Sequence, residues 1–179
     1  MERVYAEFYT ADNSKVTLRS ARTSDLQDFL DFINSLVDEQ ADILLEERLT
    51  LEDEIDWLRN LMAEIENGIV ISVVAEIDGR IIGNSGVRRG TGRNSHVGLL
   101  HIAVRNSYRN AGIGTEMIQT LIEESRKIGL MLLHLTVSSS NQQAIHLYEK
   151  IGFREVGRWP KAMRKGNEYV DEVCMALEL

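Results

Sequence analysis

The fold of this chain is decided by one stretch, which reads Leu99-Leu100-His101-Ile102-Ala103-Val104-Arg105-Asn106-Ser107-Tyr108-Arg109-Asn110-Ala111-Gly112-Ile113-Gly114-Thr115. Its first six residues are apolar and rich in branched side chains, which predicts a strand. Apolar residues then recur at helical spacing from Met117 to Ile128. Between them lies a turn with the pattern Arg109-x-x-Gly112-x-Gly114, and glycines let a backbone approach a ligand that a Cβ would keep away. We therefore predict a strand, a tight turn and a helix.

The start of this helix is a candidate anion site. A first turn without obstructing side chains offers unpaired N–H groups and the positive end of the helix dipole, which suit a phosphate or pyrophosphate. A glycine pair before a helix can equally serve the turn alone. A dinucleotide fingerprint would need a third glycine where Met117 stands, and a P-loop would need Gly-Lys-Ser/Thr, which the turn lacks. Both of these motifs are excluded.

Composition indicates an ordinary globular chain. Its 179 residues predict one domain over 1–179, in which 1–13 form an N-terminal extension. The net charge of −8 argues against nucleic acid or an anionic membrane as a partner. The N-terminal residues lack the apolar core of a signal peptide, and no window resembles a membrane span. With Cys174 as the single cysteine, in an apolar stretch, we expect a reducing, cytoplasmic location.

The first half of the chain predicts a strand, two helices and a hairpin. Residues 15–19 alternate as a short strand, and a helix capped by Thr23 or Ser24 runs to about Glu39. A capping box at Thr50 to Asp53 opens the second helix, which ends at Asn67-Gly68. Its expected buried stripe is Leu51, Ile55, Leu58, Met62 and Ile65. Strands at 69–77 and 80–87 flank Asp78-Gly79, a strong hairpin signal.

Acidic residues gather around the loop between these helices. They are Glu46, Glu47, Glu52, Asp53 and Glu54. A solvated acidic face is the plainer interpretation, because runs of charge usually mean exposure. The alternative is an electrostatic attraction for a cationic amine substrate.

The second half predicts a parallel strand and a C-terminal pair. Residues 130–137 are continuously apolar, as expected of a buried strand parallel to its predecessor across a helical crossover. A helix follows from Ser138-Ser139-Ser140-Asn141 to Ile151, stopped by Gly152. Segments 153–159 and 169–179 read as strands joined through 160–167. The order of elements predicts an α/β domain with a mixed sheet and one right-handed crossover.

Two motifs together resemble the GNAT superfamily of N-acetyltransferases, over the chain from about Lys15 to its end. They are Tyr108-Arg109-x-x-Gly112-x-Gly114 and Asn141-x-x-Ala144-Ile145-x-Leu147-Tyr148-x-x-x-Gly152-Phe153. The resemblance implies a largely antiparallel central sheet flanked by helices, with one parallel strand pair splayed around the coenzyme. It also implies acetyl-CoA as co-substrate, and the segment 166–176 looks like that of members acting on amino acids, small amines or protein N-termini.

The resemblance assigns the binding residues as follows. Backbone groups of Ile102, Ala103 and Val104 would meet the pantetheine arm and the thioester. Amides of Arg109, Asn110, Ala111, Gly112, Ile113, Gly114 and Thr115 would hold the pyrophosphate. Asn141 would hydrogen-bond the coenzyme, and Tyr148 would face its sulfur.

Tyr148 also suits the chemistry on independent grounds. When an amine attacks a thioester, a thiolate leaves whose conjugate thiol has a pKa of about 8.5, and a phenol near 10 can donate a proton to it. Backbone N–H groups can stabilise the developing oxyanion. The alternative is that Tyr148 only packs its helix against the sheet, as aromatics at helical spacing usually do.

The general base is less evident. Relatives carry a glutamate at positions that resemble Gly98 and Thr136, and neither residue can accept a proton usefully. An α-amine of pKa about 7.7 to 8.0 has an appreciable neutral fraction without a base, so this absence favours an α-amine acceptor over lysine. His101 and Glu76 are candidates for a water-relayed base. His134 and His96 fit structural roles, and the histidine spacing predicts no metal site.

We therefore predict direct transfer of acetyl from acetyl-CoA to a primary amine in a ternary complex, because no nucleophile arrangement is recognisable. The acceptor stays open among free amino acids, polyamines, antibiotic-like amines and protein N-termini. The main rival is a catalytically inactive module that senses acyl-CoA. A nucleotide-binding fold lacks its third glycine. The two C-terminal strands, with their apolar residues, would allow a homodimer.

Overall fold

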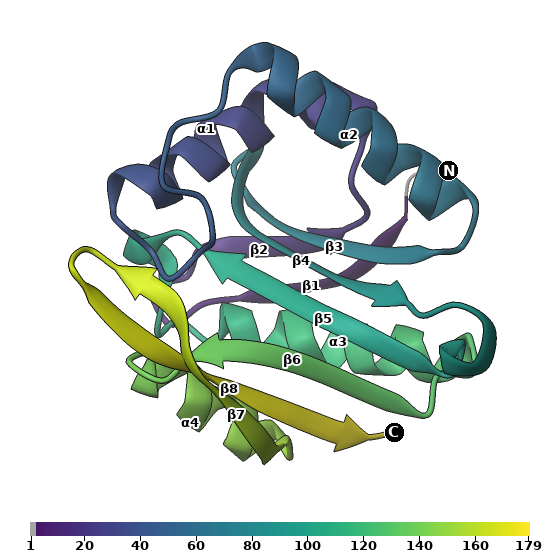
Figure 1. The fold of residues 1–179 in the computed structure, drawn as a ribbon. Coiled ribbons are helices and arrows are strands. Elements are labelled where there is room, and N and C mark those ends of the chain that lie inside the picture. The colour runs from purple at the N-terminus through teal and green to yellow at the C-terminus, as the bar shows by residue number, and fades with distance from the viewer. Residues whose placement is uncertain (1–2) are drawn as a thin grey trace.

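Eight strands form one sheet in the order β1-β2-β3-β4-β5-β6-β8-β7 in the computed structural model, which describes residues 3–179 (Figure 1). β5 and β6 are parallel, and every other neighbouring pair is antiparallel. This confirms the predicted mixed, largely antiparallel sheet. The strands are β1 (Val4–Tyr9), β2 (Lys15–Arg19), β3 (Val70–Ile77), β4 (Arg80–Arg89), β5 (Val97–Val104), β6 (Leu132–Ser138), β7 (Arg154–Lys165) and β8 (Glu168–Glu178).

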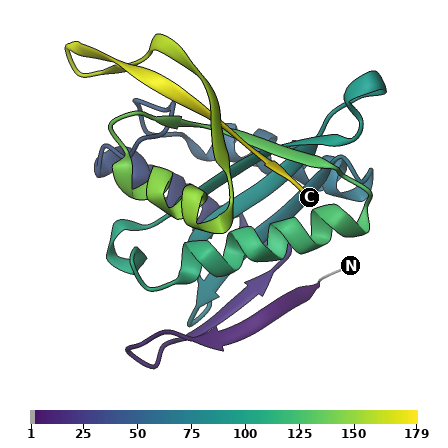
Figure 2. The ribbon, with the colours of Figure 1, turned by 90° about the horizontal axis from the view of Figure 1, so that it is seen from below.

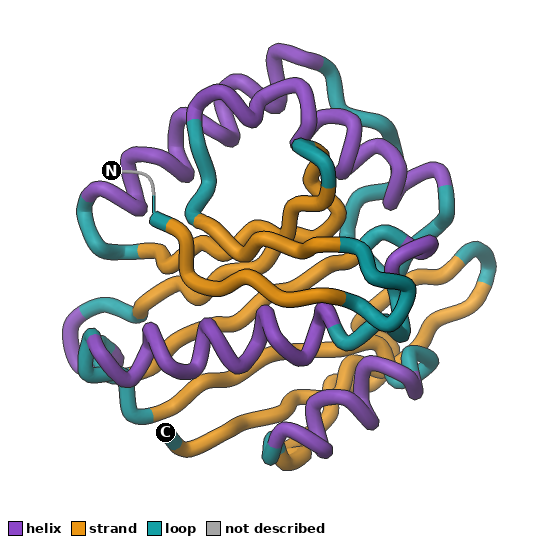
Figure 3. The backbone as a smooth tube through the Cα atoms, turned by 180° about the vertical axis from the view of Figure 1, so that it is seen from behind, coloured by secondary structure: helices purple, strands orange, loops and turns teal. Residues whose placement is uncertain are grey.

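Two layers of helices cover the two faces of the sheet. The helices are α1 (Leu26–Asp38), α2 (Leu51–Glu66), α3 (Ile113–Lys127) and α4 (Gln142–Ile151). α1 and α2 lie on one face, while α3 and α4 lie on the other (Figures 1 and 3). Because strand side chains alternate between faces, adjacent residues enter different cores: Val73 packs with α3, and Val74 packs with α1 and α2. β5, α3 and β6 form the predicted crossover.

The Asp78-Gly79 hairpin forms as predicted between β3 and β4. Asp78 has a φ of 49° and Gly79 a φ of 77°, the left-handed pair that a two-residue type I′ turn requires. The register that follows places Ser72 opposite Gly86 and Val74 opposite Asn84. This register positions the second cleft described below.

The predicted N-terminal extension contains a strand. Residues 4–9 form β1 at the edge of the sheet, and residues 1 and 2 lie outside the described part of the chain. β1 lies along α3 (Figure 2), where the Arg3 guanidinium donates to both carboxylate oxygens of Glu124 at 2.6 and 2.9 Å. The alternation of Val4–Tyr9 was too irregular to predict this strand from the sequence.

Two details of the helices differ from the prediction. A 3-10 turn over Thr23–Asp25 precedes α1, and its Asp25 carboxylate accepts the Arg22 N–H at 2.8 Å, so neither Thr23 nor Ser24 caps the helix. In α2 the Thr50 capping box forms, but Leu51 and Ile55 are exposed. The buried residues are Glu54, Leu58 and Leu61, spaced i, i+4 and i+7, so the buried face is rotated from the predicted stripe.

The segment 160–167, predicted as a connection, belongs mostly to β7. The register slips between Trp159 and Met163, which is a bulge. Lys161 has a φ of 54° there, and its N–H donates to Asp171 Oδ1 at 2.9 Å. Pro160 lies at this bulge on an edge strand, where its missing N–H costs no ladder hydrogen bond. The turn itself is reduced to Gly166 and Asn167.

Candidate functional site

β5 and β6 diverge as the splayed pair was predicted to do. Their pairing consists of Val97 with Leu132, Gly98 with Leu133 and Leu99 with His134. Beyond Leu99, β5 pairs only with β4, and β6 pairs only with β8, so the two strands separate (Figure 1). Backbone groups of β5 that face the gap therefore have no strand partner among residues 3–179.

A cleft of about 910 Å³ opens where the strands separate, and we call it the splay cleft. Four segments line it. They are the end of α1 with the loop after it (36 and 39–43), the end of β5 (102–104), the turn into α3 (108–110, 112, 114 and 115) and α4 with the residues before it (140–144, 146–148 and 150). Of the predicted coenzyme residues, ten line this cleft: Ile102, Ala103, Val104, Arg109, Asn110, Gly112, Gly114, Thr115, Asn141 and Tyr148. Ala111 and Ile113 do not, because their side chains pack toward the core.

The turn before α3 has the backbone shape that the sequence predicted. Asn110 and Gly112 both have positive φ, at 64° and 82°, and Gly112 is the residue before the first helical one. No side chain caps α3 at this end within the described chain. The first amides of the helix therefore point into the splay cleft without a side-chain partner, which suits a phosphate group. Gly112 is needed for its φ, because a Cβ there would meet nothing within 4 Å.

The Arg109 side chain braces this turn. Its Nε donates to the Val104 carbonyl at 2.8 Å, and its guanidinium is paired with Glu39 at the end of α1. The same Glu39 carboxylate accepts the Asn106 N–H at 3.3 Å. The guanidinium is thus engaged by the protein, and the backbone N–H of Arg109 donates to the Asn106 carbonyl at 3.2 Å, so the amides after Arg109 are the groups left to bind an anion.

Asn141 begins α4 and faces the same cleft. Its Oδ1 accepts the Ala144 N–H at 3.1 Å, so this side chain acts as the N-cap of the helix. Gln143, one residue further, donates to Asn110 Oδ1 and links α4 to the turn before α3. The backbone N–H of Asn141 donates to the Ser138 carbonyl at 2.9 Å, whereas its side-chain Nδ2 has no partner in residues 3–179 and is available for a ligand.

Tyr148 lies seven residues after Asn141 on α4, which is about two turns. Its residue surface is 7% exposed, and its ring meets the Phe153 ring edge-on at 5.9 Å between centroids. Its hydroxyl makes no hydrogen bond within residues 3–179, although the side chain lines the cleft. Burial raises the pKa of Tyr148 to about 12, so the phenol is protonated at physiological pH and able to donate.

The loop between α1 and α2 covers one side of the splay cleft and is tied to the β7–β8 hairpin. Lys165 Nζ lies 2.7 Å from Asp42 Oδ1, and Arg164 Nη2 lies 2.7 Å from Glu46 Oε2. Figure 1 shows the hairpin tip beside this loop. Segments more than a hundred residues apart thus close the same site.

These contacts bear on the acidic residues that the sequence singled out. Glu46 is paired with Arg164, and Asp53 accepts the Thr50 N–H at 2.9 Å as the capping box. Glu54 is buried at 2% exposure. Most of the acidic group therefore has a structural role, and only Glu47 and Glu52 face solvent among them without such a contact in residues 3–179. The geometry favours the plainer interpretation over an attraction for cations.

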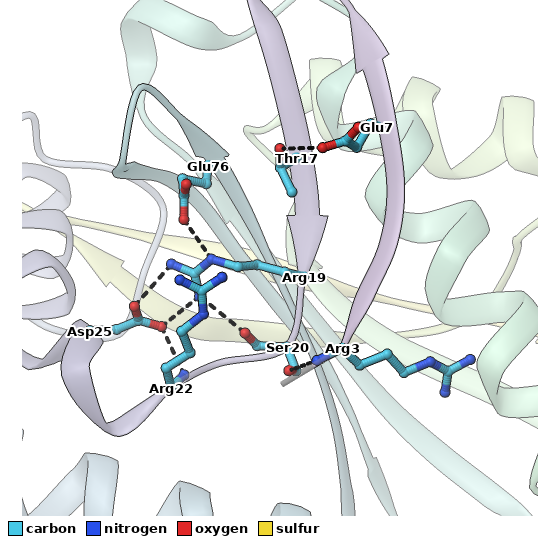
Figure 4. Close-up of polar contacts among 8 residues, drawn as sticks. All are labelled: Arg3, Glu7, Thr17, Arg19, Ser20, Arg22, Asp25 and Glu76. Carbon is cyan, nitrogen blue, oxygen red and sulfur yellow. Dashed lines mark hydrogen bonds and ion pairs between the residues drawn. The ribbon is translucent and has the colours of Figure 1, made fainter. Parts of the chain in front are cut away.

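The two candidate bases are placed differently. Glu76 lies outside the cleft and binds Arg19 Nε at 2.5 Å, while Asp25 holds the other side of that buried guanidinium at 2.7 and 2.9 Å (Figure 4). His101 lies on the α1 and α2 face of β5, directly beside Ile102 in the strand. His134 and His96, to which the sequence assigned structural roles, are exposed and line neither cleft.

Gly98, one of the positions resembling the family glutamate, faces the α3 core. A Cβ there would lie 2.5 Å from Val87 Cγ1 and 2.8 Å from Leu133 Cδ2. A larger side chain at this position would have to displace the core. Thr136, the other position, is exposed on β6 and pairs with Cys174. Neither position can supply a base to the splay cleft.

A second cleft lies between α2 and the sheet, and we call it the α2 cleft. It has a volume of about 450 Å³ and contains His101 together with Ser72, Asn84 and Arg88. Except for His101, none of these residues was predicted from the sequence to belong to a site. The interior glycine of β4, Gly86, was the one available signal, because glycine inside a strand often marks a close approach.

Residues 3–179 contain no cluster of three or more His, Cys, Asp or Glu side chains arranged to hold a metal ion. None of the helices in that range has the length and apolar character needed to cross a bilayer.

The diverging parallel pair, the open start of α3 and the buried Tyr148 phenol are gathered around one cleft. The family model described as "Acetyltransferase (GNAT) family" matches residues 32–153. The chain belongs to this family and is an N-acetyltransferase.

Individual relatives agree with this assignment. The L-methionine sulfoximine/L-methionine sulfone acetyltransferase of Pseudomonas paraeruginosa is 27% identical over 171 residues, covering 91% of this chain and 94% of that protein. A probable N-acetyltransferase, camello, of Xenopus tropicalis is 34% identical over 104 residues, covering 55% of this chain and 48% of that protein. The chain thus spans about half the length of camello.

Solved structures show the same fold. A ribosomal-protein-alanine N-acetyltransferase from Brucella melitensis superposes with a TM-score of 0.80 at 27% identity, covering 90% of this chain and 99% of that one. Other structures of the fold, at 20% and 21% identity, are described with acetyl-CoA bound. At that identity they speak for the fold alone.

Proposed function

We propose that the protein transfers an acetyl group from acetyl-CoA to a primary α-amine by direct attack within a ternary complex. The observation that carries the proposal is that the open amides before α3, the unpaired edge of β5 and the Tyr148 hydroxyl all line one cleft. These are the groups that a diphosphate, a pantetheine thioester and a leaving sulfur require. Relatives named for amino acids and for a ribosomal-protein alanine favour an α-amine.

Each step of the reaction has a group to support it. The amine nitrogen attacks the thioester carbonyl carbon, and an N–H of the β5 edge at 102–104 stabilises the oxyanion that forms. As the carbon–sulfur bond breaks, Tyr148 donates its proton to the sulfur. Because burial raises the pKa of Tyr148 to about 12, the phenol enters the reaction protonated. Its hydrogen bond to the leaving sulfur compensates for the weak acidity that this pKa implies.

A panel of amines tests the proposal. The enzyme is mixed with acetyl-CoA and either free L-amino acids, including L-methionine sulfone, an alanine-initiated peptide or a diamine. Release of thiol is then measured, with the product confirmed by mass. We expect release that depends on an α-amine. Acetyl-CoA binding in calorimetry without thiol release for any amine would instead support the rival inactive acyl-CoA-binding module.

Three finer assignments belong to the same proposal. The domain spans the chain, the protein acts in the cytoplasm, and a homodimer through β7 and β8 is compatible with the apolar surface there. Val156 and Trp159 of β7 are 67% and 59% exposed. Sedimentation of the purified protein tests the dimer, since a monomeric mass at micromolar concentration would contradict it.

A further inference from the structure

The α2 cleft has a floor made by three neighbouring strands. Ser72 of β3 lies opposite Gly86 of β4, and Gly86 lies opposite His101 of β5. Residues directly opposite in antiparallel strands point to the same face. This row therefore presents to α2 a hydroxyl from Ser72, no side chain at Gly86 and an imidazole from His101. The empty place is required, because a Cβ on Gly86 would lie 2.7 Å from the His101 ring. The imidazole therefore lies over Gly86, in the same row as Ser72.

Ser72 is a buried hydroxyl without a partner. Its residue surface is 3% exposed, and its Oγ has no hydrogen-bond partner in residues 3–179, yet the side chain lines the cleft. Leaving such a group unpaired costs about 1 to 3 kcal/mol of stability. A ligand that hydrogen-bonds to the hydroxyl would explain why a serine stands at this position. Ser125 of α3 is also buried with an unpaired Oγ, but it lines neither cleft. It provides a matched comparison.

The charges of the α2 cleft cancel. Arg88 and Glu64 are the charged residues in its lining, and they form an ion pair in which Arg88 Nη2 lies 2.7 Å from Glu64 Oε2. Both terminal nitrogens of Arg88 bond this carboxylate, so no guanidinium fork remains for a ligand carboxylate. The remaining polar side chains are uncharged: those of Asn60, Ser72, Asn84, His101 and Ser85, whose hydroxyl donates to the Val73 carbonyl at 2.9 Å. Such a lining fits amides and hydroxyls better than it fits free charges.

His101 is a proton acceptor at physiological pH. His101 is exposed along one side of the cleft, but partial desolvation of the ring and the nearby Arg88 charge lower the pKa of His101 below its usual 6.5, so the ring is neutral at physiological pH. Neither ring nitrogen of His101 has a hydrogen-bond partner within residues 3–179. A neutral imidazole can accept a proton directly or through one water.

The α2 cleft adjoins the splay cleft through one row of the sheet. Asn84 lies opposite Ala103, one row beyond Gly86 and His101, which is about 7 Å along the strands. Asn84 lines the α2 cleft, and Ala103 lines the splay cleft. An amine at this row would be next to the β5 edge where the thioester is proposed to lie, while the rest of its molecule would extend over Gly86. The volume of 450 Å³ equals that of about fifteen waters at ~30 Å³ each, which is more than a single small amino acid needs.

We propose that the α2 cleft binds the acceptor, that it selects an α-amine followed by uncharged amide groups, as at the amino end of a peptide, and that His101 takes the proton which the amine loses. This inference rests on the proposed acetyl transfer. The amine nitrogen bonds to the carbonyl carbon, the carbon–sulfur bond breaks, and the sulfur takes the Tyr148 proton. The amine proton passes through a water to His101 and then to solvent, from which the phenolate regains its own.

The first test compares two serines. In Ser72→Ala we expect the KM for L-methioninamide to rise about tenfold, the loss of one hydrogen bond, while the KM for acetyl-CoA stays unchanged. Ser125→Ala is the control, in which both KM values should stay unchanged. Both variants should melt at the same temperature as wild type or higher, because each loses an unpaired buried hydroxyl. Equal KM values in the two variants would overturn the assignment.

The second test concerns His101. In His101→Gln we expect kcat/KM to fall about 10²-fold, and the step in its pH profile below pH 6.5 should disappear, which leaves only the ionisation of the amine. His134→Gln, an exposed histidine of the neighbouring strand β6, should keep the wild-type profile. A wild-type profile in His101→Gln would show that the ring accepts no proton.

The third test compares L-methioninamide with L-methionine, which differ only in the charge beside the α-amine. With rates expressed per unprotonated amine, we expect the amide to have the higher kcat/KM by about tenfold or more. A higher value for L-methionine, or no turnover of either probe by an enzyme that acetylates another amine, would overturn this inference and leave the proposed function intact. Failure of acetyl-CoA to bind in calorimetry would overturn both.

Discussion

Tyr148 combines burial with a hydroxyl that no group of residues 3–179 satisfies. In Tyr148→Phe we expect kcat to fall about 10²-fold, because the leaving sulfur loses its proton donor. The Kd for acetyl-CoA, measured by calorimetry, should change less than twofold, since ring and packing are kept. The free energy of unfolding should stay equal or rise slightly, because no internal hydrogen bond is lost. An unchanged kcat would leave Tyr148 with the packing role alone.

Glu54 gives a prediction about pH. Burial on α2, with Asp53 beside it, raises the pKa of Glu54 from 4.5 to about 7 in the folded protein. Its contribution to stability is therefore complete below pH 4.5 and is lost as the pH rises to about 7. In Glu54→Gln, urea unfolding at pH 8 should give a higher free energy than wild type, by at most roughly 3 kcal/mol. The difference should shrink toward pH 4, and a constant difference across this range would contradict the burial argument.

At the residue scale, the sequence predicted the backbone of the site better than its side chains. The glycine pattern predicted the turn at 109–115 because its signal is local, whereas the role of Tyr148 was implied by the family resemblance and stays a prediction. That Arg109 points to Val104 and Glu39 was not predictable, because Glu39 is seventy residues away. The unpaired hydroxyl of Ser72 depends on its neighbours in three dimensions, which a serine in an apolar strand does not reveal.

Among the elements, the start of α3 depends most on a single residue. Gly112 has a φ of 82° and no neighbour that a Cβ would touch. Gly112→Ala should therefore cost about 1 to 2 kcal/mol through backbone strain alone, measured by thermal unfolding. The backbone would relieve this strain by rotating the N–H groups at the start of α3 away from the splay cleft. The Kd for acetyl-CoA should therefore also rise severalfold.

Gly157 of β7 offers a control for this change. Its Cβ would also meet nothing within 4 Å, and its φ is not in the left-handed region. Gly157→Ala should leave both stability and acetyl-CoA binding within error of wild type. If both alanine variants behaved alike, the conformation of Gly112 would not be what the helix start requires.

At the element scale, strands and helices with strong local signals were predicted, and those set by tertiary contacts were not. The Asp78-Gly79 hairpin and the Thr50 capping box have their information within four residues. The buried face of α2 is instead chosen by what lies beneath it, and Glu54 in that face breaks the apolar pattern. β7 passes through Pro160 because β8 provides a partner on one side, which composition alone does not indicate.

Across the whole molecule, the loop between α1 and α2 is held by the distant β7–β8 hairpin. Asp42 is 18% exposed and Lys165 is 50% exposed in their ion pair. A double-mutant cycle of Asp42→Asn and Lys165→Met should give a coupling of up to about 1 kcal/mol in unfolding, as for other partly exposed pairs. The coupling should decline with added salt. A coupling of zero at low salt would show that the loop is held by other contacts.

The fold as a whole was predictable because its order of elements allows one crossover and a continuous sheet. The place of β1 was not predictable, since an edge strand with half its side chains in water has a weak pattern. The two clefts differ in the same way. The splay cleft follows from strand order, whereas the α2 cleft follows from which side chains happen to meet across three strands.

The divergence of β5 and β6 has a mechanical consequence. Within residues 3–179, three ladder pairs join the five strands before the gap to the three strands after it. Acetyl-CoA bound in the gap would contact both parts and oppose their separation. It would add RT ln(1 + [L]/Kd) to the free energy of unfolding, where [L] is its free concentration. This amounts to about 2.7 kcal/mol when [L] is a hundred times Kd. The empty enzyme should come apart first along this seam, so the supply of donor would govern how long each copy survives proteases.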